Sequence, residues 1–350
     1  MTRPYSLVLL AALSTLAAQA QQSLPATSIT TNHAVTEADG TVRMQRVMPL
    51  PHTISPEAQA WLSRPAGDAN VPQTLAERRA QLDTSQAKHR DELLKMFPAT
   101  ITDKAVAGVP VRDVMPMKML HTDRVLICLH GGGFNADSGS YSEAIPVAGL
   151  TGTRVVSVLY RMAPEHPFPA AVDDAVAVYR ELLKTYKPAR IGIFGSSAGA
   201  GLTLETAVKL KQLKLPMPAA IGPFSTQAGM DEGGDTRSLY NTDGLRGYVP
   251  VAGGTINNEY VGSTNHKDPV LSPIYADLHG MPPALFISSE RDLLLSSTSN
   301  MHRAFLQAGV DAQLIVFEAL PHVFWNNNTL PETREAWGYM ASFFSTQLGK

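Results

Sequence analysis

The sequence has little of what would point to a metal, a disulfide framework or a polyanionic partner. It contains a single cysteine, Cys128, so no intrachain disulfide can form, and its histidines show no spacing typical of a metal site. Charged residues make up 17% of the chain and the formal net charge is −2, which gives no reason to expect nucleic acid or acidic lipid as a partner. Internal repeats and heptad seams are absent as well.

Apolar residues, in contrast, are plentiful and follow an alternating pattern of strands and helices. They make up 44% of the 350 residues, enough to bury one large core. From about residue 105 onward, apolar runs typical of strands alternate with helix patterns, and Cys128 lies in one of these runs, where its thiol is expected to pack. This alternation predicts the α/β class with a mostly parallel sheet.

The first twenty residues have the pattern of a targeting segment. Arg3 precedes an apolar stretch over residues 5–18, and Ala18 and Ala20 form an A-x-A cleavage pattern. The stretch is too short to span a bilayer comfortably. We therefore expect residues 1–20 to be a signal peptide and the mature protein to be periplasmic or secreted, without stable membrane insertion; an N-terminal anchor is the alternative.

The next eighty residues divide into a polar part and a helical part. Residues 21–50 are rich in Ser and Thr without clear periodicity, so we expect a tether or a loosely packed lead-in. Within residues 51–100, Ser55 is expected to cap a helix that has Pro56 in its first turn. A longer, charged helix is expected over residues 75–97.

A serine flanked by glycines is the most informative motif of the chain. Residues 195–199 have the sequence Gly-Ser-Ser-Ala-Gly, follow the apolar run 190–194 and open onto a helix pattern at 200–213. This is the G-x-S-x-G spacing of a nucleophile elbow, in which a strand turns sharply into a helix and leaves room only for glycine on either side. Ser197 is therefore the candidate nucleophile, and the N–H of Ala198 would lie at the positive end of the helix.

A second glycine-rich turn lies upstream. Residues 130–134 have the sequence His-Gly-Gly-Gly-Phe and follow the buried strand pattern 124–129. Three glycines allow backbone N–H groups to point outward, and such preorganised donors stabilise an oxyanion by about 2.7–4 kcal/mol each. No Lys-Ser/Thr pair follows, as a phosphate-binding P-loop would require.

The base is expected after the nucleophile and the acid, in the order Ser, acid, His. His322 lies in the loop beyond the strand pattern 312–318 and is the candidate. His302 also follows a plausible acid, but it lies inside the amphipathic segment 297–307, where a surface position fits better.

The acid is expected just beyond the strand pattern 284–288. Asp292 lies in the turn after it and is preferred to Glu290, which could instead pair with Arg291. Asp268 precedes the strand and has the context of a turn residue. Glu165 is also excluded from catalysis by the order, and we expect the proline-rich segment 160–169 to be a stiff loop that supports the glycine turn.

Together these features resemble the hormone-sensitive-lipase family of α/β-hydrolases, the bacterial carboxylesterases with an H-G-G-G motif. The matching blocks are residues 130–134, 160–169 and 195–199 and the loops of Asp292 and His322. The resemblance implies an α/β-hydrolase fold, with a mostly parallel central sheet, helices on both faces and a helical cap. The core would occupy residues 101–350, and the cap would consist of residues 51–100 and an insertion at about 224–261.

The resemblance also implies the site. It assigns a catalytic triad of Ser197, Asp292 and His322, with the N–H groups of Gly132, Gly133 and Ala198 as the oxyanion hole. Two positions depart from the family pattern: Ser196 stands where Asp or Thr is frequent, and the loop after Asp292 lacks a second acid. Neither change involves a triad atom.

We therefore expect hydrolysis of small, fairly apolar carboxylic esters with short to medium acyl chains, through an acyl-enzyme on Ser197 and without cofactor or metal. The residues expected to line the pocket are bulky: Phe134, Met162, Phe224, Phe324 and Trp325. A lactone hydrolase, a carbohydrate-ester deacetylase and an amidase on the same triad remain alternatives. A non-catalytic small-molecule-binding protein on this scaffold is an alternative of another class, although it would be expected to lack part of the triad. Monomer and homodimer are both open.

Overall fold

The computed structural model describes residues 33–65, 74–231, 233–242, 244–247 and 258–349. The expected signal peptide and the first part of the lead-in lie outside the described residues. The chain forms two compact units, Met1–Pro49 and Leu50–Lys350. Everything that positions the candidate site belongs to the second unit.

The first unit contains a β-hairpin where the sequence suggests a loose lead-in. Its strands are β1 (His33–Thr36) and β2 (Val42–Gln45), which pair in antiparallel fashion. Between them Gly40 has a φ of 87°, and the Asp39 carboxylate accepts a hydrogen bond from the N–H of Thr41. An Asp-Gly pair is a strong hairpin signal that the polar composition of this stretch conceals.

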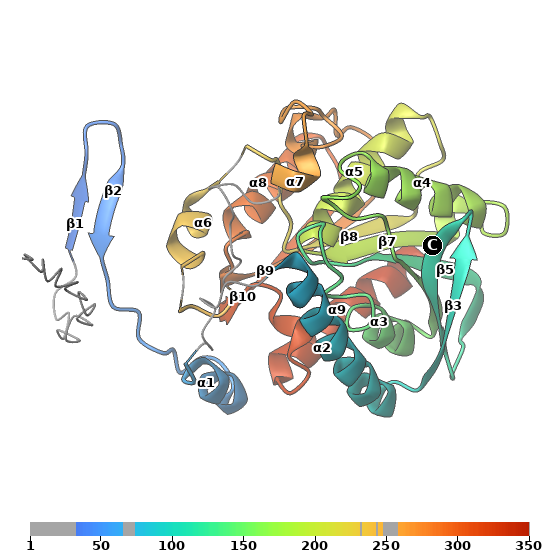
Figure 1. Cartoon of the computed structure of the whole chain (residues 1–350), viewed down its shortest axis with the longest axis horizontal. Coiled ribbons are helices and arrows are strands. Elements are labelled where there is room, and N and C mark those ends of the chain that lie inside the picture. Colours follow the sequence, from blue (N-terminus) through green and yellow to red (C-terminus); the bar gives the residue numbers. More distant parts are fainter. Residues whose placement is uncertain (1–32, 66–73, 232, 243, 248–257, 350) are drawn as a thin grey trace, which may run out of the picture. The chain divides into compact units, whose positions relative to one another are not determined.

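An eight-stranded sheet forms the centre of the second unit (Figure 1), in the order β10-β9-β8-β7-β5-β6-β4-β3. The strands are β3 (Ala99–Val106), β4 (Val109–Pro116), β5 (His121–Leu129), β6 (Thr153–Val158), β7 (Ile191–Ser196), β8 (Ala220–Phe224), β9 (Ala284–Arg291) and β10 (Ala312–Pro321). Strand β4 is antiparallel to both of its neighbours, β3 and β6, and all other pairs are parallel. The predicted α/β-hydrolase fold, with its mostly parallel sheet, is confirmed.

Helices cover both faces of this sheet. The longer ones are α2 (Leu75–Met96), α3 (Ala144–Thr151), α4 (Ala170–Leu182), α5 (Ala198–Gln212), α8 (Leu295–Gln307) and α9 (Pro331–Gln347). Figure 1 shows α4, α5 and α8 on one side of the sheet and α3 and α9 on the other. Strand β5 illustrates why two cores result: Ile127 packs in one buried cluster and Cys128 in the other, because successive side chains of a strand point to opposite faces. Burial raises the pKa of the Cys128 thiol well above its usual range.

Helices also form in the regions expected to make up the cap. Helix α1 (Pro56–Leu62) is capped by Ser55 as predicted, and α2 begins with a reciprocal capping box between Thr74 and Glu77. The expected second cap segment contains α6 (Asp235–Tyr240) and α7 (Asn258–Val261), while residues 248–257 lie outside the described residues. Among the described residues, short 3-10 turns also occur at η1 (Pro188–Arg190), η3 (Pro273–Tyr275) and η4 (Phe324–Asn326).

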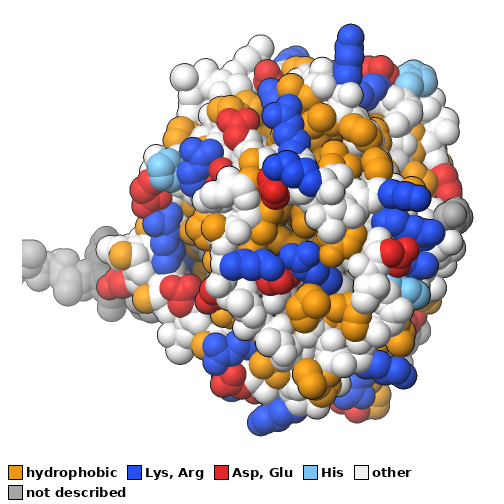
Figure 2. Space-filling view, turned by 90° about the vertical axis from the view of Figure 1, so that its right-hand side faces the viewer, with side chains coloured by type: hydrophobic (Ala, Val, Ile, Leu, Met, Phe, Trp, Pro, Cys, Tyr) orange, Lys and Arg blue, Asp and Glu red, His pale blue; other side chains and the backbone are white. Residues whose placement is uncertain are grey.

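The surface agrees with the near-neutral composition. On the face shown in Figure 2, basic side chains are interspersed with acidic and apolar ones, and no field of one sign covers it. Within the described ranges, no helix combines the length and the apolar character needed to cross a bilayer.

Parallel topology determines where chemistry can occur. The carboxyl ends of β5, β7, β8, β9 and β10 lie at one edge of the sheet, and the loops that follow these strands contain His130, Ser197, Ser225, Asp292 and His322. In open α/β sheets, ligands bind at this edge.

Candidate active site

The turn from β7 into α5 has the geometry of a nucleophile elbow. Ser197 has φ 57° and ψ −121°, a conformation that a residue with a side chain rarely adopts. A Cβ atom on Gly195 would lie 2.1 Å from the carbonyl oxygen of Leu129, and one on Gly199 would lie 1.8 Å from the same atom. Both glycines of the G-x-S-x-G pattern are thus required by the close approach of β5 to the turn.

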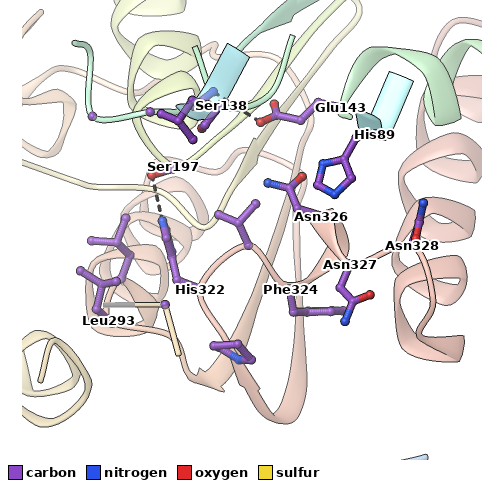
Figure 3. A pocket seen from close by; sticks show the side chains of 18 of the residues that line it. His89, Ser138, Glu143, Ser197, Leu293, His322, Phe324, Asn326, Asn327 and Asn328 are labelled. Atoms are coloured by element: carbon purple, nitrogen blue, oxygen red, sulfur yellow. Dashed lines mark hydrogen bonds between the residues drawn. The ribbon is translucent and has the colours of Figure 1, made fainter. Parts of the chain in front are cut away.

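The structure brings together the serine, the acid and the histidine that the sequence singles out, and Figure 3 shows the contact between the serine and the histidine. His322 Nε2 lies 2.8 Å from Ser197 Oγ, and His322 Nδ1 lies 2.7 Å from Asp292 Oδ1. In this arrangement the imidazole can accept the serine proton at one nitrogen while the carboxylate holds the other nitrogen as a donor. Glu290, the alternative acid, is exposed to solvent, whereas Asp292 is completely buried.

Asp292 stays ionised in spite of its burial. Loss of solvent alone would raise the pKa of this carboxyl, but the adjacent His322 and several hydrogen bonds hold the pKa below its ordinary value. The donors include the N–H of Leu294 at 2.9 Å and the hydroxyl of Ser288 at 2.8 Å. A charged carboxylate at this position can stabilise the imidazolium that forms when the histidine accepts a proton.

Ser225 is a contributor that sequence reasoning missed. It directly follows β8, and its hydroxyl donates a hydrogen bond to Asp292 Oδ2 and lies 2.9 Å from His322 Nδ1. Strand β8 ends beside β9 at the edge of the sheet where Asp292 lies. The position of Ser225 at the end of β8 was therefore the signal by which the sequence could have indicated it. The sequence interpretation instead placed the preceding residue, Phe224, in the pocket.

Ser225→Ala is expected to lower kcat for a simple ester by about tenfold, because a hydrogen bond to a charged group contributes about 1.5–3 kcal/mol. The loss should appear in kcat rather than in KM, since the hydroxyl contacts the acid and the base and not the cavity. Steady-state kinetics on the variant test this, with its far-UV spectrum as a control for folding. An unchanged kcat would mean that Asp292 is held adequately by its other donors.

The glycine turn after β5 lies beside the serine. Gly132, Gly133 and Ala198 line the same cavity as Ser197, as the expected oxyanion donors should. Gly132 has φ 121°, and a Cβ there would lie 2.0 Å from the carbonyl oxygen of Ala136. Ala198 is the first residue of α5, so its N–H also carries the positive end of the helix dipole.

Glu143, a second residue that sequence reasoning missed, connects the two turns. Its carboxyl accepts hydrogen bonds from the N–H of Gly131 at 3.4 Å and from the N–H of Ser196 at 3.1 Å. Gly131 directly precedes Gly132, an expected oxyanion donor, and Ser196 directly precedes Ser197. Burial, with a contribution from nearby Asp137, raises the pKa of Glu143 well above its usual range. A Cβ on Gly139 would lie 2.0 Å from Glu143 Oε1, so the carboxyl also needs a glycine beside it.

Removal of the Glu143 carboxyl should loosen the arrangement of both turns. We expect Glu143→Ala to lower kcat by about 10- to 100-fold, since displacement of reacting groups by about 1 Å can cost 100-fold. Glu143→Gln keeps one acceptor and should lose less. Parallel kinetics and thermal melts of the two variants provide the measurement; equal, near-wild-type kcat values for both would contradict the positioning role.

The candidate site opens into a cavity of about 1010 Å³. Its lining includes Trp61 of α1 and His89 of α2, so the predicted N-terminal cap helices contribute to it. Helix α2 is held to the core through Arg79, whose guanidinium pairs with Glu165 at 2.7 Å and donates to the carbonyl of Asn135 at 2.7 Å. Glu165 is thus engaged in structure, and the hydrogen bonds from Arg79 lower its pKa to about 2.

The pocket residues expected from the sequence need correction. Of the five bulky side chains, only Phe324 lines the cavity. Phe134 stacks on Tyr260 with ring centroids 3.7 Å apart, Met162 packs against the same cluster, and Phe224 lies in the opposite core. Trp325 is buried too, and its indole N–H donates to Ser196 Oγ at 3.1 Å. Bulky side chains next to strand ends turn into the core here, because that is where they bury most area.

Comparison with known proteins identifies the family. A family model described as an alpha/beta hydrolase fold matches residues 126–326. The chain belongs to the hormone-sensitive-lipase-like family of α/β-hydrolases. The predicted resemblance and the predicted class of enzyme, a hydrolase of the carboxylesterase type, are confirmed.

Relatives of this hydrolase include an acetyl-hydrolase from Streptomyces hygroscopicus, 33% identical over 69% of this chain and 85% of the relative. An esterase from Acinetobacter venetianus is 28% identical over 72% of this chain and 86% of its own length. Among solved structures, the esterase E25 aligns with a TM-score of 0.75 and 32% identity, over 86% of this hydrolase and 97% of E25. An esterase of the bacterial hormone-sensitive lipase family aligns with a TM-score of 0.69 and 31% identity, over 80% and 94% of the two chains.

Proposed function

We propose that this hydrolase cleaves carboxylic esters with short acyl chains through a covalent acyl-enzyme on Ser197. The observation that carries the proposal is the 2.8 Å contact between Ser197 Oγ and His322 Nε2, in a cavity that Gly132 and Gly133 also line. The names of its relatives, among them an acetyl-hydrolase and a carboxylesterase from Mycobacterium tuberculosis, agree with this chemistry.

In the first step, Ser197 Oγ attacks the ester carbonyl carbon while His322 Nε2 takes its proton. The carbonyl oxygen becomes an oxyanion, which the N–H groups of Gly132, Gly133 and Ala198 are proposed to stabilise. Asp292 holds the imidazole in the required tautomer and stabilises its charged form. Collapse of the intermediate expels the alcohol, which takes the proton from His322 and leaves the acyl group on the serine.

In the second step, His322 removes a proton from water, and the resulting hydroxide attacks the acyl carbon. The new oxyanion occupies the same place, and its collapse returns the proton to Ser197 and releases the acid. Leu293 and Leu294 from the loop after Asp292 line the cavity and offer an apolar surface to a small acyl group. Of the five bulky residues expected to line the pocket, only Phe324 does so, and the other four pack in the core.

The proposal is tested by trapping the intermediate. The enzyme is mixed with 4-nitrophenyl acetate, quenched in acid during the pre-steady state and digested, and the mass of the peptide that contains Ser197 is measured. An acetyl adduct on Ser197, with turnover decreasing from acetate to decanoate esters, is expected. Turnover without any adduct on this peptide, or an adduct on another residue, would contradict the proposed mechanism.

We further propose that the mature protein is exported and begins at Gln21. The A-x-A pattern ending at Ala20 supports this cleavage point. N-terminal sequencing of protein recovered from the periplasmic or culture fraction should give Gln21 as the first residue. An intact Met1 in the membrane fraction would instead support an anchor.

A further inference from the structure

The cavity has two chemically different sides. In Figure 3, Leu293 lies on one side of Ser197 and His322, while His89, Asn326 and other polar side chains lie on the opposite side, together with Phe324. An acyl group of two to four carbons needs only a small part of a cavity of about 1010 Å³. The polar side is therefore available to the alcohol part of the ester.

Asn326 is the most informative residue on the polar side. Its Oδ1 atom is buried and has no hydrogen-bond partner, and it is the one such residue in the described part of the chain that also lines the cavity. Figure 3 shows its amide close to the side chains of His89 and Glu143. A buried carbonyl oxygen without a partner is unfavourable, so a ligand that donates a hydrogen bond to it would be favoured.

The loop that carries Asn326 is held in place without a ligand. It follows His322 directly, and the hydroxyl of Thr333 donates to the carbonyl of Asn327 at 2.7 Å. The amide of Asn328 donates to Glu92 of α2 at 3.0 Å, and Trp325 is fixed by its hydrogen bond to Ser196. The amide is thus presented by a preorganised loop, which reduces the entropy lost when a ligand binds.

The surrounding charges select the kind of donor. A carboxylate or a fully ionised phosphate has no hydrogen to donate to Asn326 Oδ1. An ammonium group could donate, but Arg64 and Arg78 also line the cavity and would oppose it. An alkyl chain would cover Asn326 and His89 without replacing their contacts with water. A neutral hydroxyl group satisfies the amide without these penalties.

We propose that the polar side of the cavity binds a polyhydroxylated alcohol, so that the preferred substrates are short-chain esters of sugars or similar polyols. This inference rests on the ester hydrolysis proposed above. Water adds its OH to the acyl carbon and its proton to the alkoxide, giving a short-chain acid and the free polyol. Asn326 is the specificity residue, and its role is to bind the alcohol rather than to take part in proton transfer.

The test uses two acetates matched in shape, methyl 6-O-acetyl-α-glucoside and cyclohexylmethyl acetate. Both carry the ester on a CH2 group attached to a six-membered ring, and only the first bears ring hydroxyls. Each kcat/KM is divided by the rate constant of hydroxide-catalysed hydrolysis of the same ester, which removes differences in intrinsic reactivity. We expect the wild-type enzyme to prefer the glucoside by at least about tenfold.

Asn326→Leu should lower that preference by about tenfold, through a higher KM for the glucoside and with little effect on the cyclohexyl ester. Asn300→Leu is the matched control: the same change is made on an exposed side chain of α8 that does not line the cavity, and the preference should persist. An equal loss on both esters in Asn326→Leu would show a structural role and overturn the inference.

Wild-type measurements alone also decide the matter if the variant fails to fold. Free methyl α-glucoside should inhibit hydrolysis of 4-nitrophenyl acetate at lower concentration than cyclohexylmethanol does, and the opposite order would overturn the inference. Turnover of 4-nitrophenyl acetate without preference for the glucoside would refute the polyol site while leaving ester hydrolysis intact. Absence of turnover on all three esters would refute the proposed function itself.

Discussion

Ser197→Ala is expected to lower kcat/KM for an aryl acetate by about 10⁴- to 10⁶-fold, as the loss of the serine nucleophile does in a well-studied hydrolase. The reason is that no other hydroxyl is held at the elbow with its oxygen 2.8 Å from His322 Nε2. The variant should still fold, because the close packing at Gly195 and Gly199 fixes the strained backbone at position 197 and the hydroxyl does not. Stopped-flow or steady-state assays, with a thermal melt to show that the variant is folded, provide the measurement.

The neighbouring serine is the matched control. Ser196 is buried, and its hydroxyl accepts the indole N–H of Trp325 at 3.1 Å rather than facing the cavity. Ser196→Ala should keep most of the activity and lose about 1–3 kcal/mol of stability, because the indole N–H would be left without its partner. Comparable turnover by the two variants would remove Ser197 from the mechanism.

Asp292→Asn is expected to lower kcat by about 10⁴-fold, the loss seen when the acid of a comparable triad is replaced by its amide. The amide would present an NH2 group where His322 Nδ1 now finds an acceptor at 2.7 Å, and the imidazole would adopt the wrong tautomer. Glu290→Gln removes a carboxylate only two residues away, on an exposed side chain, and should have little effect. The kcat values of the two variants give the comparison, and the reverse ranking would assign the acid role to Glu290.

Much of the fold and of the proposed site could be predicted because the constraints are local. The glycines beside Ser197 and the strands before Asp292 and His322 are visible in short stretches of sequence, and parallel topology then places their loops at one edge. The sheet topology and the comparisons with known proteins confirmed the predicted fold and family. The catalytic roles stay predictions until the variants above are measured.

The residues that were missed act across long distances in the chain. Ser225 contacts Asp292 and His322, which lie 67 and 97 positions further along, and Glu143 binds a backbone N–H that lies 53 positions after it. No local pattern distinguishes such a serine or glutamate from an ordinary loop residue. The pocket assignment failed for a related reason: a sequence shows that Phe224 or Trp325 is bulky, but not whether it faces the cavity or the core.

The positions of the three tryptophans have an optical consequence. Trp61 lines the cavity, whereas Trp325 and Trp337 are almost completely buried. A ligand entering the cavity changes the solvent around one indole and leaves the surroundings of the other two largely as they were. The enzyme therefore carries its own fluorescent reporter of occupancy, and binding can be followed by emission from the native chain without an attached dye.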